Sequence, residues 1–391
     1  MRILFYDDAP DFGGHELQTL AAVRHIAAQP HTEVGFIYFR GNARLSKLIA
    51  EVAAQCPSFK AIPQDYASGK FQVFRTLVSR RAIQKISAQM ATYAPDLVVI
   101  AQGAIAYCSA GLLAAKKVGL PSVSYIPMTH PERLFSASRI RAALREPVNH
   151  FYYRQPDEYI TIGARMEDYL RQRGLRQPVT VVQPAVELSD LQFVDKLAAR
   201  ASLGFAVSDK VVALIGRVQF WQKRQDLAVE ALALARPKNP DLKLLIVGDG
   251  PDLDGLKALV SARGLQDAVV FAGWTDGLSA VYCAVDALVI PSRYEGLPLV
   301  MLQALYFRLP VIASDVDGMA DLLPPNWLFP SGNASAFADR LVQVISTTDD
   351  ALLAAHSDKV VKEFSLPVFE QAFMAAIVSA VNRLRLGRAA R

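Results

Sequence analysis

The sequence contains little cysteine, and its cysteines form no recognisable motif. Only three occur among the 391 residues, Cys56, Cys108 and Cys283, and their spacing is not that of a metal site. Each lies in or beside an apolar run, so we expect buried free thiols in a reducing compartment. The first residues, Met1-Arg-Ile-Leu-Phe-Tyr-Asp, lead into a strand and lack the layout of a signal peptide. We therefore expect a cytoplasmic protein.

A long uninterrupted apolar run is also lacking. Residues 97–115 approach the length of a membrane-spanning helix, but Gln102, Gly103 and Ser109 interrupt them. A strand followed by a helix is the favoured interpretation. The composition, with 52% hydrophobic and 20% charged residues and no low-complexity tract, is typical of a globular protein.

Acidic residues are scarce in parts of the first half of the chain. Between Arg40 and Lys85, nine basic residues stand against two acids, Glu51 and Asp65. A second basic cluster comprises Arg133, Arg139, Arg141, Arg145 and Arg154. One interpretation is a solvated helix face, and the other is a surface that docks on anionic lipid or an acidic acceptor. Nucleic acid is disfavoured because no recognition module is visible.

The length of the chain predicts two domains of about 150 to 200 residues each. Short apolar runs alternate with longer helical patterns, which is typical of parallel sheets built from βαβ units. Strands are expected at residues 3–6, 34–39, 97–101, 122–126, 159–162 and 179–182, and then at 210–216, 242–247, 269–271, 287–290 and 311–313. The pattern therefore predicts an α/β fold with two parallel sheets.

The boundary between the two series is expected in residues 184–209, which are polar and helix-like and contain no strand pattern. We predict a first domain at 1–190, a second at 205–362 and a C-terminal helix at 363–391. That helix would return to pack on the first domain and tie the two together.

A carboxylate follows one of the predicted buried strands. Glu295 and Gly296 form a tight turn after residues 287–290, and a helix is expected from about Pro298. Ligands bind open α/β sheets at such strand ends, and a helix start offers free backbone N–H groups to an anion. The segment therefore predicts a donor site.

Two cations are expected near the same place. Gly216-Arg217 ends the first strand of the second domain, and Lys223 follows where the next helix is expected to begin. Together they suit a diphosphate, whereas the alternative is an ordinary surface Arg and Lys.

Glycine-containing turns follow three further predicted strands. Gly248 and Gly250 in Val247-Gly-Asp-Gly-Pro251 allow close approach of a ligand to the backbone. A nucleotide base would fit near Gly273 and Trp274, and the alternative for Trp274 is a packing residue. In the first domain, Gly13-Gly14 precedes a helical run and predicts a second anion-facing turn.

In this order the motifs resemble the family 4 retaining glycosyltransferases. The resemblance covers nearly the whole chain, is most specific at residues 210–325 and is loose at residues 40–120. Its motifs are Gly13-Gly14-His15-Glu16, Gly216-Arg217 with Lys223, Val247-Gly-Asp-Gly-Pro251, Pro291-Ser-Arg-Tyr-Glu295-Gly and Leu309-Pro-Val-Ile-Ala-Ser-Asp-Val-Asp-Gly318.

The resemblance implies the GT-B architecture, in which two Rossmann-like domains face across a cleft. Arg217 and Lys223 would then neutralise the diphosphate of a nucleotide sugar, and Glu295 would contact the donor sugar. The amides of Leu299 and Val300 would bind phosphate. No metal and no cofactor besides the donor substrate is expected, because the two cations and the helix start stabilise the developing charge.

Four positions need separate comment within this resemblance. His130 lies about where the family often has a histidine near the donor sugar, and a plain loop histidine is the alternative. Gln303 stands where the family commonly has a glutamate that binds the ribose hydroxyls. Arg308 replaces a usual glycine, and Asp321 replaces a usual glutamate. These changes bear on ribose binding and on the choice of nucleotide.

The expected function is a retaining transfer of a sugar from a UDP or GDP donor to a saccharide or lipid-linked saccharide, in polysaccharide or glycoconjugate biosynthesis. We expect a cytoplasmic protein with peripheral contact to anionic membrane through its basic first domain. One alternative is a sugar-nucleotide epimerase of the same architecture. A phosphorylase is disfavoured because nothing marks a pyridoxal phosphate lysine. Another alternative is a non-catalytic partner that binds a nucleotide sugar.

Overall fold

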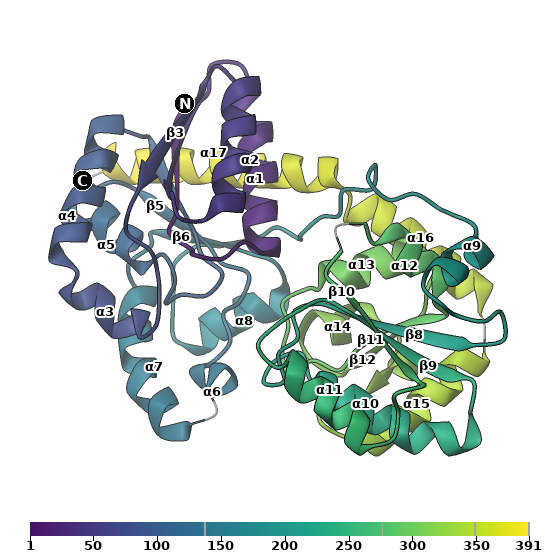
Figure 1. Ribbon diagram of the computed structural model, residues 1–391. Coiled ribbons are helices and arrows are strands. Elements are labelled where there is room, and N and C mark those ends of the chain that lie inside the picture. The colour runs from purple at the N-terminus through teal and green to yellow at the C-terminus, as the bar shows by residue number, and fades with distance from the viewer. Residues whose placement is uncertain (137, 276, 348, 390–391) are drawn as a thin grey trace. The chain divides into compact units, whose positions relative to one another are not determined.

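The computed structural model describes residues 1–136, 138–275, 277–347 and 349–389 (Figure 1). The chain divides into two compact units. Unit 1 comprises Met1–Ala185 together with Leu366–Arg391, and unit 2 comprises Val186–Ser365. Each unit contains one parallel β-sheet with helices on both faces.

The sheet of unit 1 has seven strands in the order β3-β2-β1-β4-β5-β6-β7. The neighbouring pairs are parallel, as expected for strands linked by crossover helices. The strands are β1 Arg2–Asp7, β2 Glu33–Phe39, β3 Phe59–Gln64, β4 Leu97–Ala101, β5 Ser122–Tyr125, β6 Glu158–Thr161 and β7 Val179–Val181.

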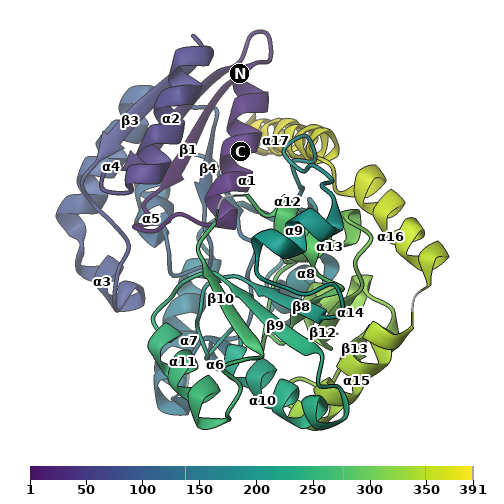
Figure 2. The same ribbon diagram turned by 45° about the vertical axis from the view of Figure 1, so that its right-hand side comes forward.

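Helices cover both faces of this sheet (Figures 1 and 2). The helices α1, α2 and α17 lie on one face, and α3, α4, α5 and α7 lie on the other. Their bounds are α1 Gly14–Ala27, α2 Ala43–Gln55, α3 Gln72–Val78, α4 Arg80–Tyr93, α5 Ser109–Lys117, α6 Glu132–Phe135, α7 Arg139–Tyr153, α8 Ala164–Gln172 and α17 Leu366–Ala389.

The C-terminal helix α17 is part of unit 1. The Phe373 ring on α17 is fully buried and lies 5.1 Å from the Tyr125 ring on β5, centroid to centroid. Arg383 donates to both carboxylate oxygens of Glu158 on β6, at 2.9 and 2.6 Å. Because a bidentate pair fixes both side chains in orientation, it holds the second half of α17 against this sheet.

Unit 2 has a six-stranded parallel sheet in the order β10-β9-β8-β11-β12-β13. Its strands are β8 Lys210–Ile215, β9 Leu242–Val247, β10 Val269–Gly273, β11 Ala287–Ile290, β12 Val311–Ser314 and β13 Leu328–Phe329. Its helices are α9 Lys196–Ser202, α10 Gln225–Ala235, η1 Arg236–Lys238, α11 Leu253–Ala262, α12 Ser279–Ala284, α13 Leu299–Tyr306, α14 Asp317–Leu322, η2 Pro325–Trp327, α15 Ala334–Ser346 and α16 Asp350–Glu363.

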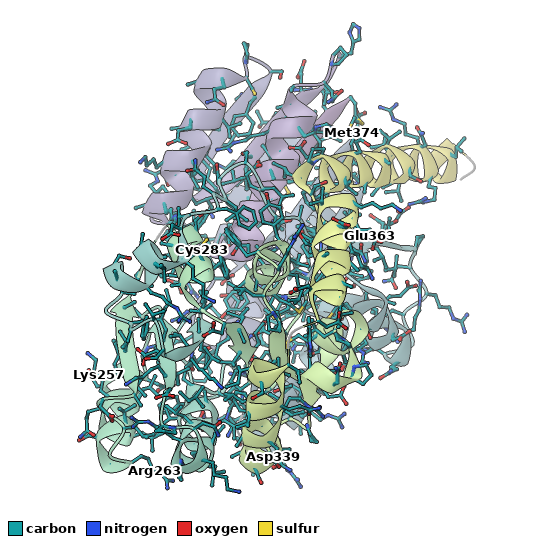
Figure 3. All side chains as sticks on the ribbon, turned by 90° about the vertical axis from the view of Figure 1, so that its right-hand side faces the viewer. Lys257, Arg263, Cys283, Asp339, Glu363 and Met374 are labelled. Carbon is teal, nitrogen blue, oxygen red and sulfur yellow. The ribbon has the colours of Figure 1, made fainter. Side chains whose placement is uncertain are left out.

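The two faces of this second sheet are covered separately. The helices α10, α11 and α15 lie on one face, and α9, α12, α13 and α16 lie on the other. Figure 3 shows Lys257 on α11 and Arg263 directly after it, Asp339 on α15 and Cys283 on α12. The central strands are almost wholly apolar, since a parallel sheet is buried on both sides.

The predicted α/β class with two parallel sheets is confirmed, and several details differ. The sequence pattern missed β3, β13 and α16. Strand β3 contains Pro63, which cannot donate to a neighbouring strand; the structure accommodates it because β3 is an edge strand. Helix α10 begins at Gln225, so Lys223 precedes the helix rather than starting it. Cys108 is buried as expected, but Cys56 and Cys283 are only partly buried.

Candidate active site

The strand order places a switch point at the centre of the sheet of unit 2. Strand β8 has β9 on one side and β11 on the other, so the connections that follow β8 and β11 leave toward opposite faces of the sheet. Ligands of doubly wound sheets bind beyond the carboxyl ends of the strands at such a point. The connection after β8 carries Arg217 and Lys223, and the connection after β11 carries Glu295.

Lys223 and Glu295 contact each other directly. The Lys223 Nζ donates to Glu295 Oε1 at 2.6 Å, although the two residues are 72 positions apart. The side chains are 22% and 8% exposed, respectively. Because the pair is largely removed from water, its attraction is stronger than that of a surface ion pair. The predicted cation and carboxylate therefore lie in one place.

The backbone around Glu295 is held by Asp317 at the start of α14. The Glu295 N–H donates to Asp317 Oδ2 at 2.9 Å. The Gly318 N–H donates to the Gly296 carbonyl at 3.2 Å, and a Cβ at Gly318 would come within 2.6 Å of that oxygen. The glycine is thus required by the close approach of the two turns, which fixes the position of Glu295.

The turn after β8 is packed tightly against the turn after β9. Gly216 and Gly248 both have positive φ, 147° and 135°. A Cβ at Gly248 would lie 2.1 Å from the Gly216 carbonyl oxygen, and one at Gly250 would lie 2.2 Å from the Val218 oxygen. Packing between the two turns therefore requires the predicted glycines, because no other residue permits these backbones to approach so closely.

Arg217 is exposed, and its backbone is fixed. Its carbonyl accepts from the buried Gln225 Nε2 at 2.9 Å. Within the described part of the chain, no hydrogen bond or ion pair holds its guanidinium. Lys223 lies beside the same turn, with its Cε 3.8 Å from where a Cβ of Gly216 would be. Both predicted cations are thus at the end of β8, and only one has an internal partner.

Helix α13 begins at Leu299, after Pro298 as N-cap. The first N–H groups of a helix have no partner within it, so the Leu299 and Val300 amides are available to an anion. One turn further on, Gln303 Oε1 accepts from the Tyr282 hydroxyl at 2.8 Å. This bond orients the Gln303 amide and leaves its NH₂ group as a donor.

The structure also defines the surroundings of Gly273, Trp274 and Arg308. Gly273 has a φ of 68°, and its carbonyl accepts from the Gly248 N–H at 2.7 Å. Trp274 is 64% exposed, so the alternative that it is a packing residue is wrong. At Arg308 the backbone is left-handed, with a φ of 57°, which explains why glycine suits this position.

In unit 1, Gly13 and Gly14 are exposed at the start of α1. The Gly13 N–H already donates to Glu16 Oε2 at 2.7 Å. One donor of the predicted anion-facing turn is therefore used by a carboxylate of the chain, in the manner of a capping box.

Sequence reasoning missed a cluster of buried acids beside this turn. Asp7 is the last residue of β1, Asp8 follows it, and both are fully buried. Asp8 accepts from Tyr6 Oη at 2.8 Å and from the Cys108 N–H at 3.2 Å. The Asp7 Oδ2 has no partner among the described residues. Two acids directly after a strand were the available signal, because strand ends collect functional groups.

Burial changes the ionisation of this cluster. It raises the pKa of the Asp7 carboxyl well above its usual value, and repulsion from Glu16 raises it further. It also lowers the pKa of the His15 imidazole in the first turn of α1. Both shifts favour neutral groups, since a charge loses its hydration when buried.

His130 lies in the connection after β5 and is 1% exposed. Its ring contacts the rings of Phe135 and Tyr169, at centroid distances of 5.8 and 5.2 Å. Arg173 donates to the carbonyls of Thr129 and His130 at 2.7 and 2.8 Å. A ligand would reach this ring only after Phe135 or Tyr169 moved.

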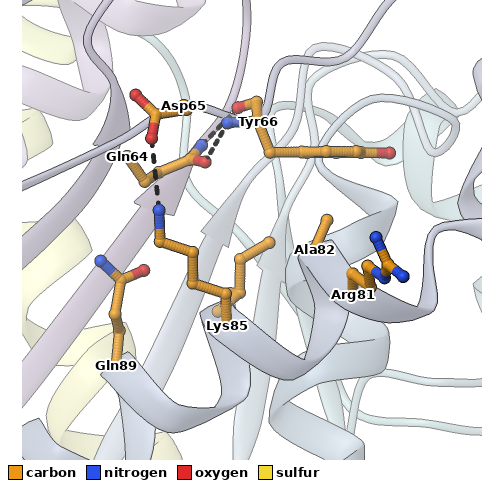
Figure 4. Close-up of a pocket in the computed structure, with 8 residues that line it drawn as sticks. Gln64, Asp65, Tyr66, Arg81, Ala82, Lys85 and Gln89 are labelled. Atoms are coloured by element: carbon orange, nitrogen blue, oxygen red, sulfur yellow. Dashed lines mark hydrogen bonds and ion pairs between the residues drawn. The ribbon is translucent and has the colours of Figure 1, made fainter.

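A pocket of roughly 250 Å³ lies elsewhere in unit 1, between the end of β3 and α4 (Figure 4). Arg81 and Lys85 line it, and Lys85 donates to Asp65 at 3.2 Å. Sequence reasoning did not identify it. Among the described residues, no group of three or more His, Cys, Asp or Glu side chains could hold a metal ion.

Both units match known protein families. Residues 209–347 match the family described as glycosyl transferases group 1, and residues 13–185 match a glycosyl transferase 4-like domain. The chain is 32% identical over 179 residues to the lipopolysaccharide core biosynthesis mannosyltransferase LpsB of Rhizobium meliloti, which covers 44% of this chain and 49% of that protein. It is 28% identical over 223 residues to the alpha-D-kanosaminyltransferase of Streptomyces kanamyceticus, covering 54% and 57%. The chain thus spans about half the length of these relatives.

The fold is also that of solved structures. The Anabaena protein Alr3699/HepE, in complex with UDP and glucose, superposes with a TM-score of 0.78 at 19% identity. The superposition covers 97% of this chain and 100% of that one. At this level of identity, the similarity establishes the fold alone.

Proposed function

Because this chain belongs to the family 4-like glycosyltransferases of the GT-B fold, we propose that it transfers a hexose or related sugar from a UDP or GDP donor with retention of anomeric configuration. The acceptor is a saccharide or a lipid-linked saccharide. The reaction belongs to the synthesis of a polysaccharide or glycoconjugate.

The observation that carries the proposal is the contact between Lys223 and Glu295 beside Arg217, at the switch point of unit 2. Cleavage of the donor leaves negative charge on the departing diphosphate. Arg217 and Lys223, with the amides of Leu299 and Val300, supply fixed positive groups for that charge. Preorganised charge of this kind lowers the barrier because it needs no reorganisation during the reaction.

Glu295 has two roles in this proposal. Its carboxylate holds Lys223 at 2.6 Å, and its second oxygen is available to a hydroxyl of the donor sugar. We propose that these residues carry the reaction without a metal ion, since two cations and a helix start supply the positive charge.

The relatives favour particular substrates. The HepE structures contain UDP with glucose, or UDP-glucose, which favours a uridine donor. LpsB acts in lipopolysaccharide core biosynthesis, which favours a surface saccharide as acceptor. No helix of the described residues is both long and apolar enough to cross a membrane. We propose a cytoplasmic location with peripheral contact to anionic membrane through the basic part of unit 1.

A donor screen tests the proposal. Thermal shifts with UDP, GDP and ADP sugars identify the donor, since a ligand at 100 times its dissociation constant adds about 2.7 kcal/mol to the stability. Slow release of free nucleotide from the identified donor then reports bond cleavage. Arg217→Ala should reduce this release at least about tenfold, whereas the exposed Lys238→Ala control should not.

The same assay addresses the alternatives. An epimerase would convert the donor sugar without releasing nucleotide, and a non-catalytic partner would bind a donor without altering it. Gln303 is the residue that favours the non-catalytic alternative, because it replaces a carboxylate that relatives commonly carry. The intact Lys223–Glu295 contact favours catalysis.

A further inference from the structure

An exposed apolar surface lies on two adjoining helices of unit 1. Its side chains belong to the start and outer face of α3 and to one face of α7. They are Phe71, Phe74, Leu77, Val78, Ile140, Leu144 and Phe151, with exposed fractions between 41% and 79%. We call this set the α3/α7 surface. The two helices are in contact, and the Tyr152 hydroxyl on α7 donates to the Val73 carbonyl on α3 at 2.7 Å (Figure 1).

The outward side of α3 is largely apolar, whereas its buried side combines the apolar Val73 with polar residues. Its buried positions include Gln72 and Thr76, which bond to each other at 2.7 Å. Thr76 also bonds to the buried Ser109 on α5 at 2.8 Å. Its apolar side chains Leu77 and Val78 are 46% and 79% exposed. Exposure of such apolar side chains is unfavourable unless a partner covers them, so this side of α3 has the character of an interaction site.

Phe71 strengthens this conclusion. It is 67% exposed, and its backbone is left-handed with a φ of 59°. Asparagine or glycine would fit this conformation with less strain, so an exposed phenylalanine here is unfavourable for folding on two counts. A binding role accounts for both.

Unbalanced positive charge surrounds the apolar side chains. Residues 66–95 contain no acid, and residues 133–156 contain only Glu146. Glu146 is bonded to Arg173 at 3.3 Å within the unit. The cations near the surface that have no ion pair in the described part of the chain include Lys70, Arg75, Arg80, Arg81, Arg139, Arg141 and Arg154.

We propose that the α3/α7 surface docks on an anionic lipid bilayer, with its apolar side chains inserted at the interface and its cations on the headgroups. Aromatic and aliphatic side chains beside Lys and Arg are the combination that interfacial helices use. A second copy of the chain fits less well, because a two-fold interface would bring this positive surface against itself. The inference deepens the membrane contact proposed above and assigns it to named side chains.

Vesicle sedimentation of the full chain tests the proposal without any substrate. The wild type should sediment with vesicles that contain phosphatidylglycerol, remain in solution with phosphatidylcholine alone, and bind more weakly as salt is raised. The apolar variant Phe71→Asn/Leu77→Ser/Ile140→Ser should bind at least about tenfold less. The charge variant Arg139→Glu/Arg141→Glu should also bind about tenfold less.

Matched controls separate binding from folding. Leu386→Ser removes a leucine of α17 that is 71% exposed, and Lys116→Glu/Lys117→Glu reverses two exposed charges on α5; both variants should bind like the wild type. The single variant Phe71→Asn should keep or raise the thermal midpoint while it weakens binding.

Three results would overturn the proposal. These are a wild type that stays in solution with anionic vesicles, variants that bind as well as the wild type, and a wild-type dimer that the apolar variant dissociates without loss of vesicle binding. Donor cleavage is measured separately. If donor cleavage is intact but vesicles are not bound, this inference fails and the proposed function stands.

Discussion

The two units place different side chains, acidic in one and basic in the other, at the same topological position. In each sheet, the first strand of the unit lies beside the fourth, and a turn precedes a helix at that point. In unit 1, that end holds the buried acids Asp7 and Asp8, with Glu16 nearby. In unit 2, it holds Arg217 and Lys223, with Glu295 bonded to the lysine.

The strand order determines where a ligand binds, and the side chains at that place determine which ligand binds. A diphosphate suits the cations of unit 2. It does not suit the turn of unit 1, where Glu16 already occupies the Gly13 N–H. Neutral or hydroxyl-bearing groups suit that acidic end better than a diphosphate does. The same fold therefore serves different ligands in the two units, since fold alone does not define function.

The largest expected effect concerns the cationic end. Lys223→Ala and Glu295→Ala should each reduce kcat/KM for transfer at least about tenfold, or roughly 1.4 kcal/mol of transition-state stabilisation. The double variant should lose less than the two losses combined, because the residues act as a pair. Steady-state kinetics with Lys238→Ala as control measure this. Normal turnover in Glu295→Ala would show that the site is assigned wrongly.

The acidic end should instead respond in stability. The pKa of Asp7 is raised in the folded state, so the folded protein holds this proton more tightly than the unfolded chain does. The stability of the folded protein therefore declines as pH rises from the usual pKa of an aspartate toward the raised pKa of Asp7. Asp7→Asn should flatten this dependence and stabilise the protein at neutral pH by about 1 kcal/mol. Urea unfolding between acidic and neutral pH measures both.

Burial also raises the pKa of Asp8, so Asp8→Asn is the matched comparison for the gain in stability at neutral pH. Both Asp8 oxygens accept hydrogen bonds, one from Tyr6 and the other from Ser68 and the Cys108 N–H. Its substitution should therefore lose stability rather than gain it. Parallel pH profiles for wild type and Asp7→Asn would contradict the assignment of a raised pKa to Asp7.

A smaller effect is expected at Gln303. Gln303→Glu should leave the fold intact, because a carboxylate still accepts from the Tyr282 hydroxyl. The donor affinity should change by about threefold to tenfold, since a charge-assisted acceptor replaces an amide. Calorimetric titration with UDP, GDP and ADP sugars measures it, with Gln266→Glu as an exposed control. Unaltered binding of every nucleotide would exclude Gln303 from the donor site.

The smallest effect concerns Arg308. Arg308→Gly should raise the free energy of unfolding by about 0.5 kcal/mol, because relief of the left-handed strain outweighs the added entropy of the unfolded chain. Arg308→Ala keeps the Cβ and should bring no gain. Thermal unfolding of the two variants compares them directly, and an equal response would mean that backbone strain is absent here.

The sequence predicted much of the fold, because the alternation of strands and helices is a local property. Strand β3 was not predicted because Pro63 disfavours a strand unless the strand lies at the edge of its sheet. Whether a strand lies at an edge depends on the whole sheet and not on the local sequence. At the candidate site, the sequence pattern predicted Arg217, Lys223 and Glu295 as residues that follow strands. The burial of Asp7 and the exposure of Trp274 were not predicted, since both depend on what packs around them.

The sequence pattern alone predicts an α/β chain with two parallel sheets and chemically active residues after its strands. The position of β8 beside β11, which brings Lys223 and Glu295 into contact across 72 positions, is evident only in the folded unit. Helix and strand periodicity act over a few residues, whereas the order of strands in a sheet results from packing of the whole unit.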